Sequence, residues 1–169
     1  MVYHWQEPQK TLRLLTDSDW ATCKQTRRSK SGGMILSGDH VVHYWCKMQD
    51  RIALSSGEAE LKSVCKGVAE LLLMRNIVSF LRGAPPKLVS NLDASACKGI
   101  VLRQGAGQVK HLTTRQLWVQ ETVRDYEVQV EKVSRDDNLS DFLCSPNKEL
   151  EHNTRLAEFG CTDRQITLK

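Results

Sequence analysis

The 169-residue sequence lacks several patterns that would assign it to a special class of protein. Its six cysteines form no CxxC pair, so we predict neither a structural zinc site nor a disulfide framework, and the scattered thiols suit a reducing, intracellular setting. The longest aliphatic run, residues 71–74, is far too short to span a membrane. The first residues have no apolar core, and we therefore expect no signal peptide. No internal repeat, low-complexity segment or linker interrupts the chain.

The composition is that of an ordinary soluble globular protein. Hydrophobic residues make up 40% of the chain and charged residues 26%. We expect one domain over residues 1–169, in which residues 1–10 are a lead-in and residues 147–169 a C-terminal helical tail. The net charge of +4 is compatible with a polyanionic partner but does not require one.

The first part of the chain predicts three strands in series. Residues 12–20 begin as an apolar strand, and residues 22–33 form a polar, basic connection. Two further strands, residues 33–37 and 40–46, flank a turn at Gly38-Asp39. Short connections between consecutive strands favour an antiparallel meander.

The second part of the chain alternates between helices and strands. Ser55 and Glu58 form a capping box that opens a long helix over residues 56–81, ended by the sequence GAPP at residues 83–86. Its apolar stripe comprises Leu61, Val64, Cys65, Val68, Leu71 and Leu72. The further predicted elements are a strand at 87–91, helices at 94–102 and from 113, an alternating strand at 126–133, and a short helix around Asp141 closed by Pro146. A strand–helix–strand crossover predicts that part of the sheet is parallel.

Four acidic residues stand out because each lies at a predicted strand end or on a helix that could pack across one: Asp17, Glu60, Asp93 and Asp141. If the strands before Asp17 and Asp93 are parallel neighbours, both carboxylates share one edge of the sheet. A cluster of carboxylates repels itself unless cations neutralise it. Carboxylates, water and phosphate oxygens are the ligands that Mg²⁺ prefers, so the pattern is compatible with two-metal catalysis.

Structural roles compete with this interpretation. Asp17 or Asp19 could start the turn after the strand, and Asp93 could cap the following helix. Glu58 has a role as the glutamate of the capping box, but helical geometry alone does not choose between Glu58 and Glu60. The residues by themselves leave the metal site and the capping interpretation both open.

Six blocks of sequence resemble the ribonuclease H domain of copia-type LTR retrotransposon polyproteins. They are LTDSDWA (15–21), RRSKSGG (27–33), ALSSGEAEL (53–61), DASACKGI (93–100), KHLTTRQLWVQE (110–121) and VSRDDNLSDFL (133–143). The resemblance implies an α/β, ribonuclease-H-like mixed five-stranded sheet, with three antiparallel strands, then two parallel ones, and helices on both faces. It also implies that the metal-binding acids are Asp17, Glu60, Asp93 and Asp141. Glu60 is chosen over Glu58 because Leu61 completes the acid–leucine step of the family.

The same resemblance implies a function. The expected reaction is endonucleolytic hydrolysis of the RNA strand of an RNA–DNA hybrid with two Mg²⁺ ions, or Mn²⁺ as a substitute. The expected partners are this hybrid and the reverse transcriptase domain of the same polyprotein, with no membrane, in the cytoplasm, virus-like particles or nucleus. The candidate substrate-binding residues are Arg27, Arg28, Lys30, His111 and Arg115. We assign Trp45 and Trp118 to the core rather than to base stacking.

Two alternative functions remain open. One follows from departures from the family's sequence pattern, and the other follows from a competing motif. Leu117 stands where relatives carry the second histidine of KHxxxRxH, and residues 142–145 read FLCS instead of a Phe-Thr-Lys-like run. A catalytically inactive nucleic-acid-binding remnant is therefore an alternative. The strand followed by Asp17-Ser18-Asp19 also suggests haloacid-dehalogenase-type phosphatases, although Ala21 and an antiparallel opening fit that class worse.

Overall fold

The protein contains a five-stranded mixed sheet. The structure is a computed structural model that describes residues 3–93, 95–105, 114–135 and 137–144. The strands are β1 (Thr11–Asp19), β2 (Lys30–Ser37), β3 (His40–Met48), β4 (Lys87–Leu92) and β5 (Gln129–Lys132), in the order β3-β2-β1-β4-β5. Neighbours among β1, β2 and β3 pair antiparallel, whereas β4 is parallel to β1 and β5 is parallel to β4. The predicted mixed sheet is confirmed, and it differs from the doubly wound sheet of the phosphatase alternative.

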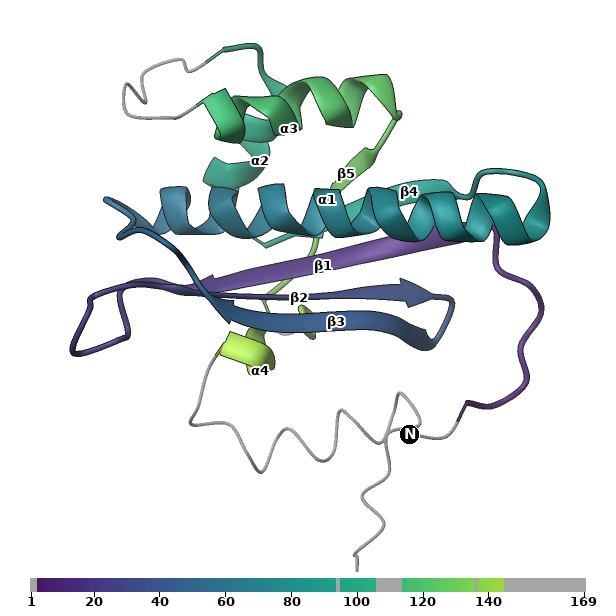
Figure 1. The fold of residues 1–169 in the computed structure, drawn as a ribbon, viewed down its shortest axis with the longest axis horizontal. Coiled ribbons are helices and arrows are strands. Elements are labelled where there is room, and N and C mark those ends of the chain that lie inside the picture. Colours follow the sequence, from purple (N-terminus) through teal and green to yellow (C-terminus); the bar gives the residue numbers. More distant parts are fainter. Residues whose placement is uncertain (1–2, 94, 106–113, 136, 145–169) are drawn as a thin grey trace, which may run out of the picture.

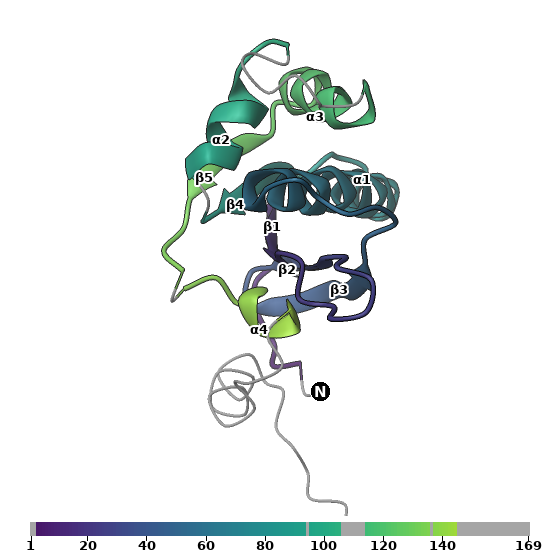
Figure 2. The same ribbon diagram turned by 90° about the vertical axis from the view of Figure 1, so that its left-hand side faces the viewer.

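Helices cover both faces of this sheet (Figures 1 and 2). They are α1 (Ser56–Arg82), α2 (Ser95–Leu102), α3 (Thr114–Asp125) and α4 (Asp141–Cys144). The first three pack together on one face, where α1 crosses β1 and β2. The short α4 contacts β1 and β2 from the other face. None of the helices in the described residues is long and apolar enough to cross a membrane.

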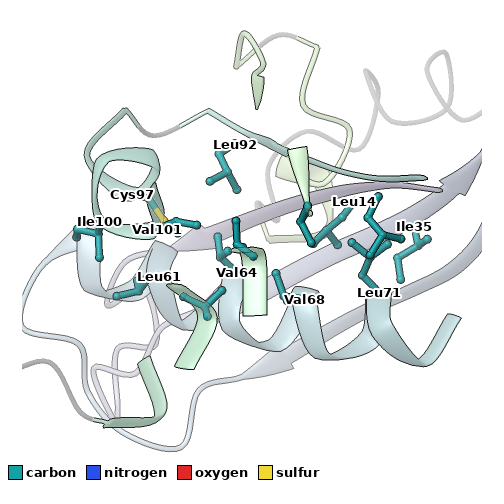
Figure 3. Close-up of a cluster of buried hydrophobic side chains, with 14 of the residues drawn as sticks. Leu14, Ile35, Leu61, Val64, Val68, Leu71, Leu92, Cys97, Ile100 and Val101 are labelled. Atoms are coloured by element: carbon teal, nitrogen blue, oxygen red, sulfur yellow. The ribbon is translucent and has the colours of Figure 1, made fainter. Parts of the chain in front are cut away.

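The main core lies between α1 and the sheet (Figure 3). Leu61, Val64, Val68 and Leu71 are each at most 1% exposed, as the predicted helical stripe requires. They meet Leu14 and Ile35 from the strands, together with residues of α2 and α3. Burying each such side chain contributes about 1.5–3 kcal/mol. A smaller cluster, which includes Leu15 and Met34, packs under α4 on the other face.

The N-terminal half of α1 is held close against β1. A Cβ atom at Gly67 would lie 2.6 Å from Cγ2 of Thr16, so the absence of a side chain permits this approach. The buried Ser63 hydroxyl donates to the backbone oxygens of Asp17 (2.8 Å) and Gly32 (3.2 Å). These contacts fix the first turns of α1 relative to the end of β1.

Both ends of α1 follow the signals in the sequence. Oγ of Ser55 accepts a hydrogen bond from the backbone N–H of Glu58, as predicted for the helix cap. The Glu58 carboxylate accepts from the backbone N–H of Leu54 at 2.8 Å, one residue before the cap. Gly83 ends the helix with a φ of 71°, a left-handed conformation that favours glycine.

Some predicted boundaries were wrong. Strand β1 continues through Asp19, and β2 begins at Lys30 rather than at residue 33, because Asp17 pairs with Gly32 and the Asp19 carboxylate accepts from the Lys30 N–H. Asp17 therefore lies inside a strand and does not start a turn. The connection between these strands spans residues 20–29, and β3 runs two residues beyond its predicted end.

The last strand is shorter than the alternating pattern of residues 126–133 predicted. β5 contains only Gln129–Lys132. Glu127 has a φ of 51°, and the N–H of Val128 donates to the backbone oxygen of Val123, so these residues close α3 instead of extending the strand. The predicted tail, Pro146 and His111 lie outside the described residues.

Candidate active site

Two of the candidate acids lie at the same edge of the sheet because β1 and β4 are parallel neighbours. Leu15 of β1 is in register with Asn91 of β4, and Asp17 and Asp93 each follow two residues later. Glu60 reaches them from the first turns of α1. One carboxylate oxygen from each of these three residues lies within 4.8 Å of the others. The structure therefore brings together three of the four predicted acids in a geometry that could hold a metal ion.

Glu60 and Glu58 point to different partners. Oε1 of Glu60 accepts from the backbone N–H of Ser18 at 3.2 Å and from its hydroxyl at 3.0 Å, which aims the carboxylate at the end of β1. Glu58 is used in the helix cap and forms an ion pair with Lys62 at 3.0 Å. Helical geometry alone did not decide which of the two glutamates is the candidate metal ligand. The contacts favour Glu60, because its hydrogen-bond donors lie on the strand that carries Asp17.

The fourth acid, Asp141, is the first residue of α4 and lines the same cleft. The segment before it is anchored to β1 by Asn138, which is 1% exposed. Nδ2 of Asn138 donates to the backbone oxygen of Thr16 at 3.1 Å, and the backbone oxygen of Asn138 accepts from the Asp141 N–H at 3.1 Å. In addition, Sγ of Cys144 donates to the backbone oxygen of Asp17 at 3.5 Å. Asp141 is thus placed by contacts to the strand that holds Asp17.

Burial and mutual repulsion raise the pKa values of two of these acids. The pKa of Asp17 is raised to about 6, chiefly by burial and then by the charges of Asp141 and Asp93. The pKa of Glu60 is raised to about 8 by burial and by the charges of Asp17 and Asp93. Both shifts mean that the fully ionised cluster is unfavourable on its own. A bound cation would offset this repulsion, and a set made only of carboxylates suits a hard divalent ion.

The acids open into a cleft of about 990 Å³. Besides them, its lining includes residues of the β1–β2 connection, the N-terminus of α1 and the segment between β5 and α4. Trp20, Lys132 and Arg135 are lining residues that the sequence did not single out. Trp20 is 51% exposed, and its indole N–H donates to the backbone oxygen of Ala53 at 3.0 Å. Arg135 lies in the VSRDDNLSDFL block (133–143), but no sequence pattern indicates that it lies near the acids.

Three of the predicted substrate-binding residues lie apart from this lining. Arg27, Arg28 and Lys30 lie on the β1–β2 connection and at the start of β2, at the same end of the sheet as Asp19 but outside the cleft. Arg115 lies in the first turn of α3, its side chain being outside the described part, as is all of His111.

The two tryptophans that were assigned to the core, Trp45 and Trp118, differ in their burial. Trp45 is half-buried against the main core, as predicted, with the Lys66 ammonium 5.8 Å from its ring. Trp118 is 38% exposed, so its assignment to the core was wrong. It lies on α3, in the N-terminal part of that helix.

Comparisons with known proteins give relatives in sequence and in fold. No family model matches the chain. It is 26% identical over 135 residues (78% of this chain) to the retrovirus-related Pol polyprotein from transposon TNT 1-94 of Nicotiana tabacum. It is also 26% identical over 157 residues (90% of this chain) to that from transposon RE1 of Arabidopsis thaliana. The chain spans 10% of the length of each polyprotein.

Solved structures of ribonucleases H share the fold. An RNase H1 isolated from compost by a metagenomic approach superposes with a TM-score of 0.59 at 13% identity, covering 79% of this chain and 92% of that one. The same enzyme in complex with an RNA/DNA hybrid gives 0.55 at 13% identity, covering 78% and 92%. The N-terminal RNase H domain of a Mycobacterium tuberculosis protein gives 0.52 at 15% identity, covering 87% and 98%. The chain therefore has a ribonuclease-H-like fold, and it is similar in sequence to part of the Pol polyproteins of plant retrotransposons.

Proposed function

We propose that the chain is a metal-dependent ribonuclease H that hydrolyses the RNA strand of RNA–DNA hybrids during retrotransposon reverse transcription. The observation that carries this proposal is the convergence of Asp17, Glu60 and Asp93 within 4.8 Å in the cleft that Asp141 also lines. The ribonuclease H structures in the comparison, one of them bound to an RNA/DNA hybrid, support the substrate class. The polyprotein relatives support a polyprotein context for the chain. The proposal adds the reverse transcriptase domain of the same polyprotein as partner, in the cytoplasm, virus-like particles or nucleus.

In this mechanism the four acids, Asp17, Glu60, Asp93 and Asp141, would hold two Mg²⁺ ions. When bound, the ions would activate a water molecule and stabilise the leaving oxygen of the phosphodiester. Ser18 keeps the Glu60 carboxylate directed at the cleft through its two hydrogen bonds. The 2′-hydroxyl groups in the shallow minor groove of a hybrid would distinguish the RNA strand. The residues proposed to contact the sugar–phosphate backbone of the hybrid are Arg27, Arg28, Lys30, His111 and Arg115.

The test is cleavage of a hybrid labelled separately on each strand, with Mg²⁺, with Mn²⁺ and with EDTA. The wild-type chain should cut only the RNA strand and only with the divalent ion. Asp17→Asn and Glu60→Gln should abolish cutting, because each removes a charge that holds the metal. Glu58→Gln is the matched control: this glutamate lies two residues from Glu60, but its carboxylate contacts Leu54 and Lys62. It should retain activity.

Two results would contradict the proposal. One is cleavage that survives in the Glu60→Gln variant, and the other is equal loss in Glu58→Gln and Glu60→Gln. Hybrid binding by a folded wild-type chain that never cuts would instead select the inactive binding module. That second candidate is favoured by Leu117, which occupies the position of the family's second histidine and is half-buried on α3.

A further inference from the structure

The lining of the acidic cleft contains two cations within the described part of the chain, Lys132 and Arg135. Lys132 is the last residue of β5, and Arg135 belongs to the segment that runs from β5 to α4. Of these two cations, the arginine forms an ion pair with one of the four acids. Nη2 of Arg135 lies 4.0 Å from Oδ1 of Asp141. A positive charge therefore lies beside the acids from which a nucleic-acid phosphate would otherwise be repelled.

The contact between Arg135 and Asp141 is loose. The arginine side chain is 77% exposed, and a separation of 4.0 Å is at the limit of an ion pair. Exposed pairs of this kind contribute little to stability. A guanidinium has five N–H donors in a planar fork that matches two oxygens of a phosphate. The pair with Asp141 leaves this capacity for bidentate binding largely unused.

The backbone that carries Arg135 is firmly held, in contrast to its side chain. The Ser134 hydroxyl donates to the Asp137 carboxylate at 2.6 Å, and the Asn138 N–H donates to the backbone oxygen of Arg135 at 3.2 Å. Asn138 in turn is buried and bonded to the backbone oxygen of Thr16, next to Asp17. Arg135 thus projects from a turn whose position is fixed relative to the acids, which is the arrangement that a positioned phosphate ligand requires.

We propose that Arg135 is a phosphate-binding residue of the cleft, which exchanges its contact with Asp141 for a backbone phosphate of the strand lying across the acids. This inference rests on the proposed function, because the phosphate belongs to the hybrid. Divalent ions at the acids would weaken the hold of Asp141 on the guanidinium and favour the exchange. Lys132 provides a point charge at the rim but has no comparable contact with the acids in the described residues.

The experiment measures binding of a labelled RNA–DNA hybrid by fluorescence anisotropy, at fixed Mg²⁺ over a series of KCl concentrations. The Glu60→Gln chain is the background, so that turnover does not consume the hybrid. Into it are introduced Arg135→Gln, Arg135→Lys and, as a matched control, Arg124→Gln. Arg124 is also exposed and loosely paired, with Asp125 at 3.8 Å, but it lies at the end of α3.

Arg135→Gln should weaken binding about ten-fold, as expected for one charge-assisted phosphate contact. It should also make the slope of log Kd against log [KCl] shallower by about 0.7–0.9, the value for one phosphate. Arg135→Lys should keep the slope and lose only a few-fold in affinity, because the charge remains but the fork does not. Arg124→Gln should match the background. The unfolding midpoint in urea should be the same for all four chains.

An unchanged Kd and salt slope in Arg135→Gln would overturn the proposal. Equal losses in the Gln and Lys variants with an unchanged slope would also overturn it, since that pattern belongs to a structural role. Failure of the proposed function gives a different result: the wild-type chain binds the hybrid but does not cut it, and the salt slopes still decide the role of Arg135. A chain that binds no hybrid would refute both proposals.

Discussion

Asp17 and Glu60 are placed at an energetic cost, which the proposed metal site would offset. Asp17 is 6% exposed, and its neighbours in the cleft carry the same charge. Glu60 accepts two hydrogen bonds from Ser18, which lower its pKa, yet burial and repulsion outweigh them and the net shift is upward. A site that served only the fold would be expected to place cations or apolar residues here. The charges are instead concentrated where a cleft gives access to a ligand.

These shifts predict how the stability of the metal-free protein depends on pH. The pKa values in the folded chain, about 6 for Asp17 and about 8 for Glu60, exceed the unfolded values of 3.8 and 4.5. The folded state therefore binds more protons, so stability falls as the pH rises from about 4 to about 8. In EDTA, urea denaturation should give a free energy of unfolding ~4 kcal/mol lower at pH 8.5 than at pH 5.5. Saturating Mg²⁺ should reverse much of this decline.

The Glu60→Gln variant tests whether the acid cluster causes this decline of stability with pH. Its amide oxygen can still accept both hydrogen bonds from Ser18, but the charge is gone, so most of the decline with pH should disappear. Glu70→Gln is the control on the same helix, because the pKa of Glu70 is lowered by its hydrogen bond with Lys66 at 2.7 Å. It should retain the decline. A decline of equal size in Glu60→Gln and the wild type would show that the acid cluster is not its source.

The sequence predicted the acids better than it predicted their surroundings. Asp17 and Asp93 were predicted from strand ends. They lie together because β1 and β4 are parallel neighbours, although β1 continues two residues beyond Asp17. Glu60 was separated from Glu58 only by the resemblance, because the deciding contacts come from Ser18 on another element. Arg135 was missed for the same reason: its neighbourhood depends on Asn138 reaching Thr16, a contact across 122 residues.

At the scale of elements, the site depends on how closely α1 approaches β1. Gly67 lies on the buried face of α1, where an added Cβ would meet side-chain atoms of Thr16 at 2.6 Å and of Leu14 at 3.1 Å. Displacement of the helix at this point would also move Glu60, which lies two turns earlier on α1. The close approach therefore links packing in the core to the position of a proposed metal ligand.

Two glycine-to-alanine changes should have opposite effects on stability. Alanine favours a helix over glycine, and at Gly99 of α2 a new Cβ meets nothing within 4 Å, so Gly99→Ala should stabilise the protein by about 0.5–1 kcal/mol. At Gly67 the steric overlap with β1 outweighs this gain, and Gly67→Ala should destabilise by about 1–3 kcal/mol. Urea denaturation of both variants measures the difference. Stabilisation by Gly67→Ala would mean that α1 is free to move away from β1.

The predicted elements were most accurate where a local signal ended them. The ends of α1 were fixed by Ser55 and Gly83, whose roles require no distant partner. The start of β2 was missed because it depends on the Asp19 carboxylate reaching the N–H of Lys30 across the connection. The pattern at 126–133 alternates like a strand, but its first residues are taken by the end of α3. A period of two in the sequence does not reveal where a neighbouring helix stops.

At the scale of the whole molecule, β1 joins all the parts that the proposed site needs. It lies at the centre of the sheet, between β2 and β4, and both α1 and α4 pack on it from opposite faces. Alternate side chains of β1 enter different clusters, Leu14 under α1 and Leu15 under α4. Asp17 is therefore carried by the central strand, which is covered on both faces, whereas β5 ends the strand order and has four residues.

This arrangement predicts a gradient of local stability that can be read by amide hydrogen exchange. The amides of Leu14 and Leu15 should exchange only on global unfolding, while those of Val130 and Glu131 in the edge strand β5 should exchange through local opening. Mg²⁺ at 100 times its Kd binds the folded state alone and should slow exchange in β1 about a hundred-fold. Exchange in β5 should change far less, because its opening leaves the acids of β1, α1 and α4 in place.

Comparing the effect of Mg²⁺ on exchange in β1 and in β5 distinguishes the possible explanations. If Mg²⁺ slowed β1 and β5 equally, β5 would open only with the whole molecule, and the sheet would unfold as one unit. If neither strand responded, the acid cluster would not bind the ion. The Glu60→Gln variant supplies the control, since it should lose most of the response in β1 while keeping the difference between β1 and β5. That difference arises from the topology of the sheet, whereas the response to the ion arises from the charges at its edge.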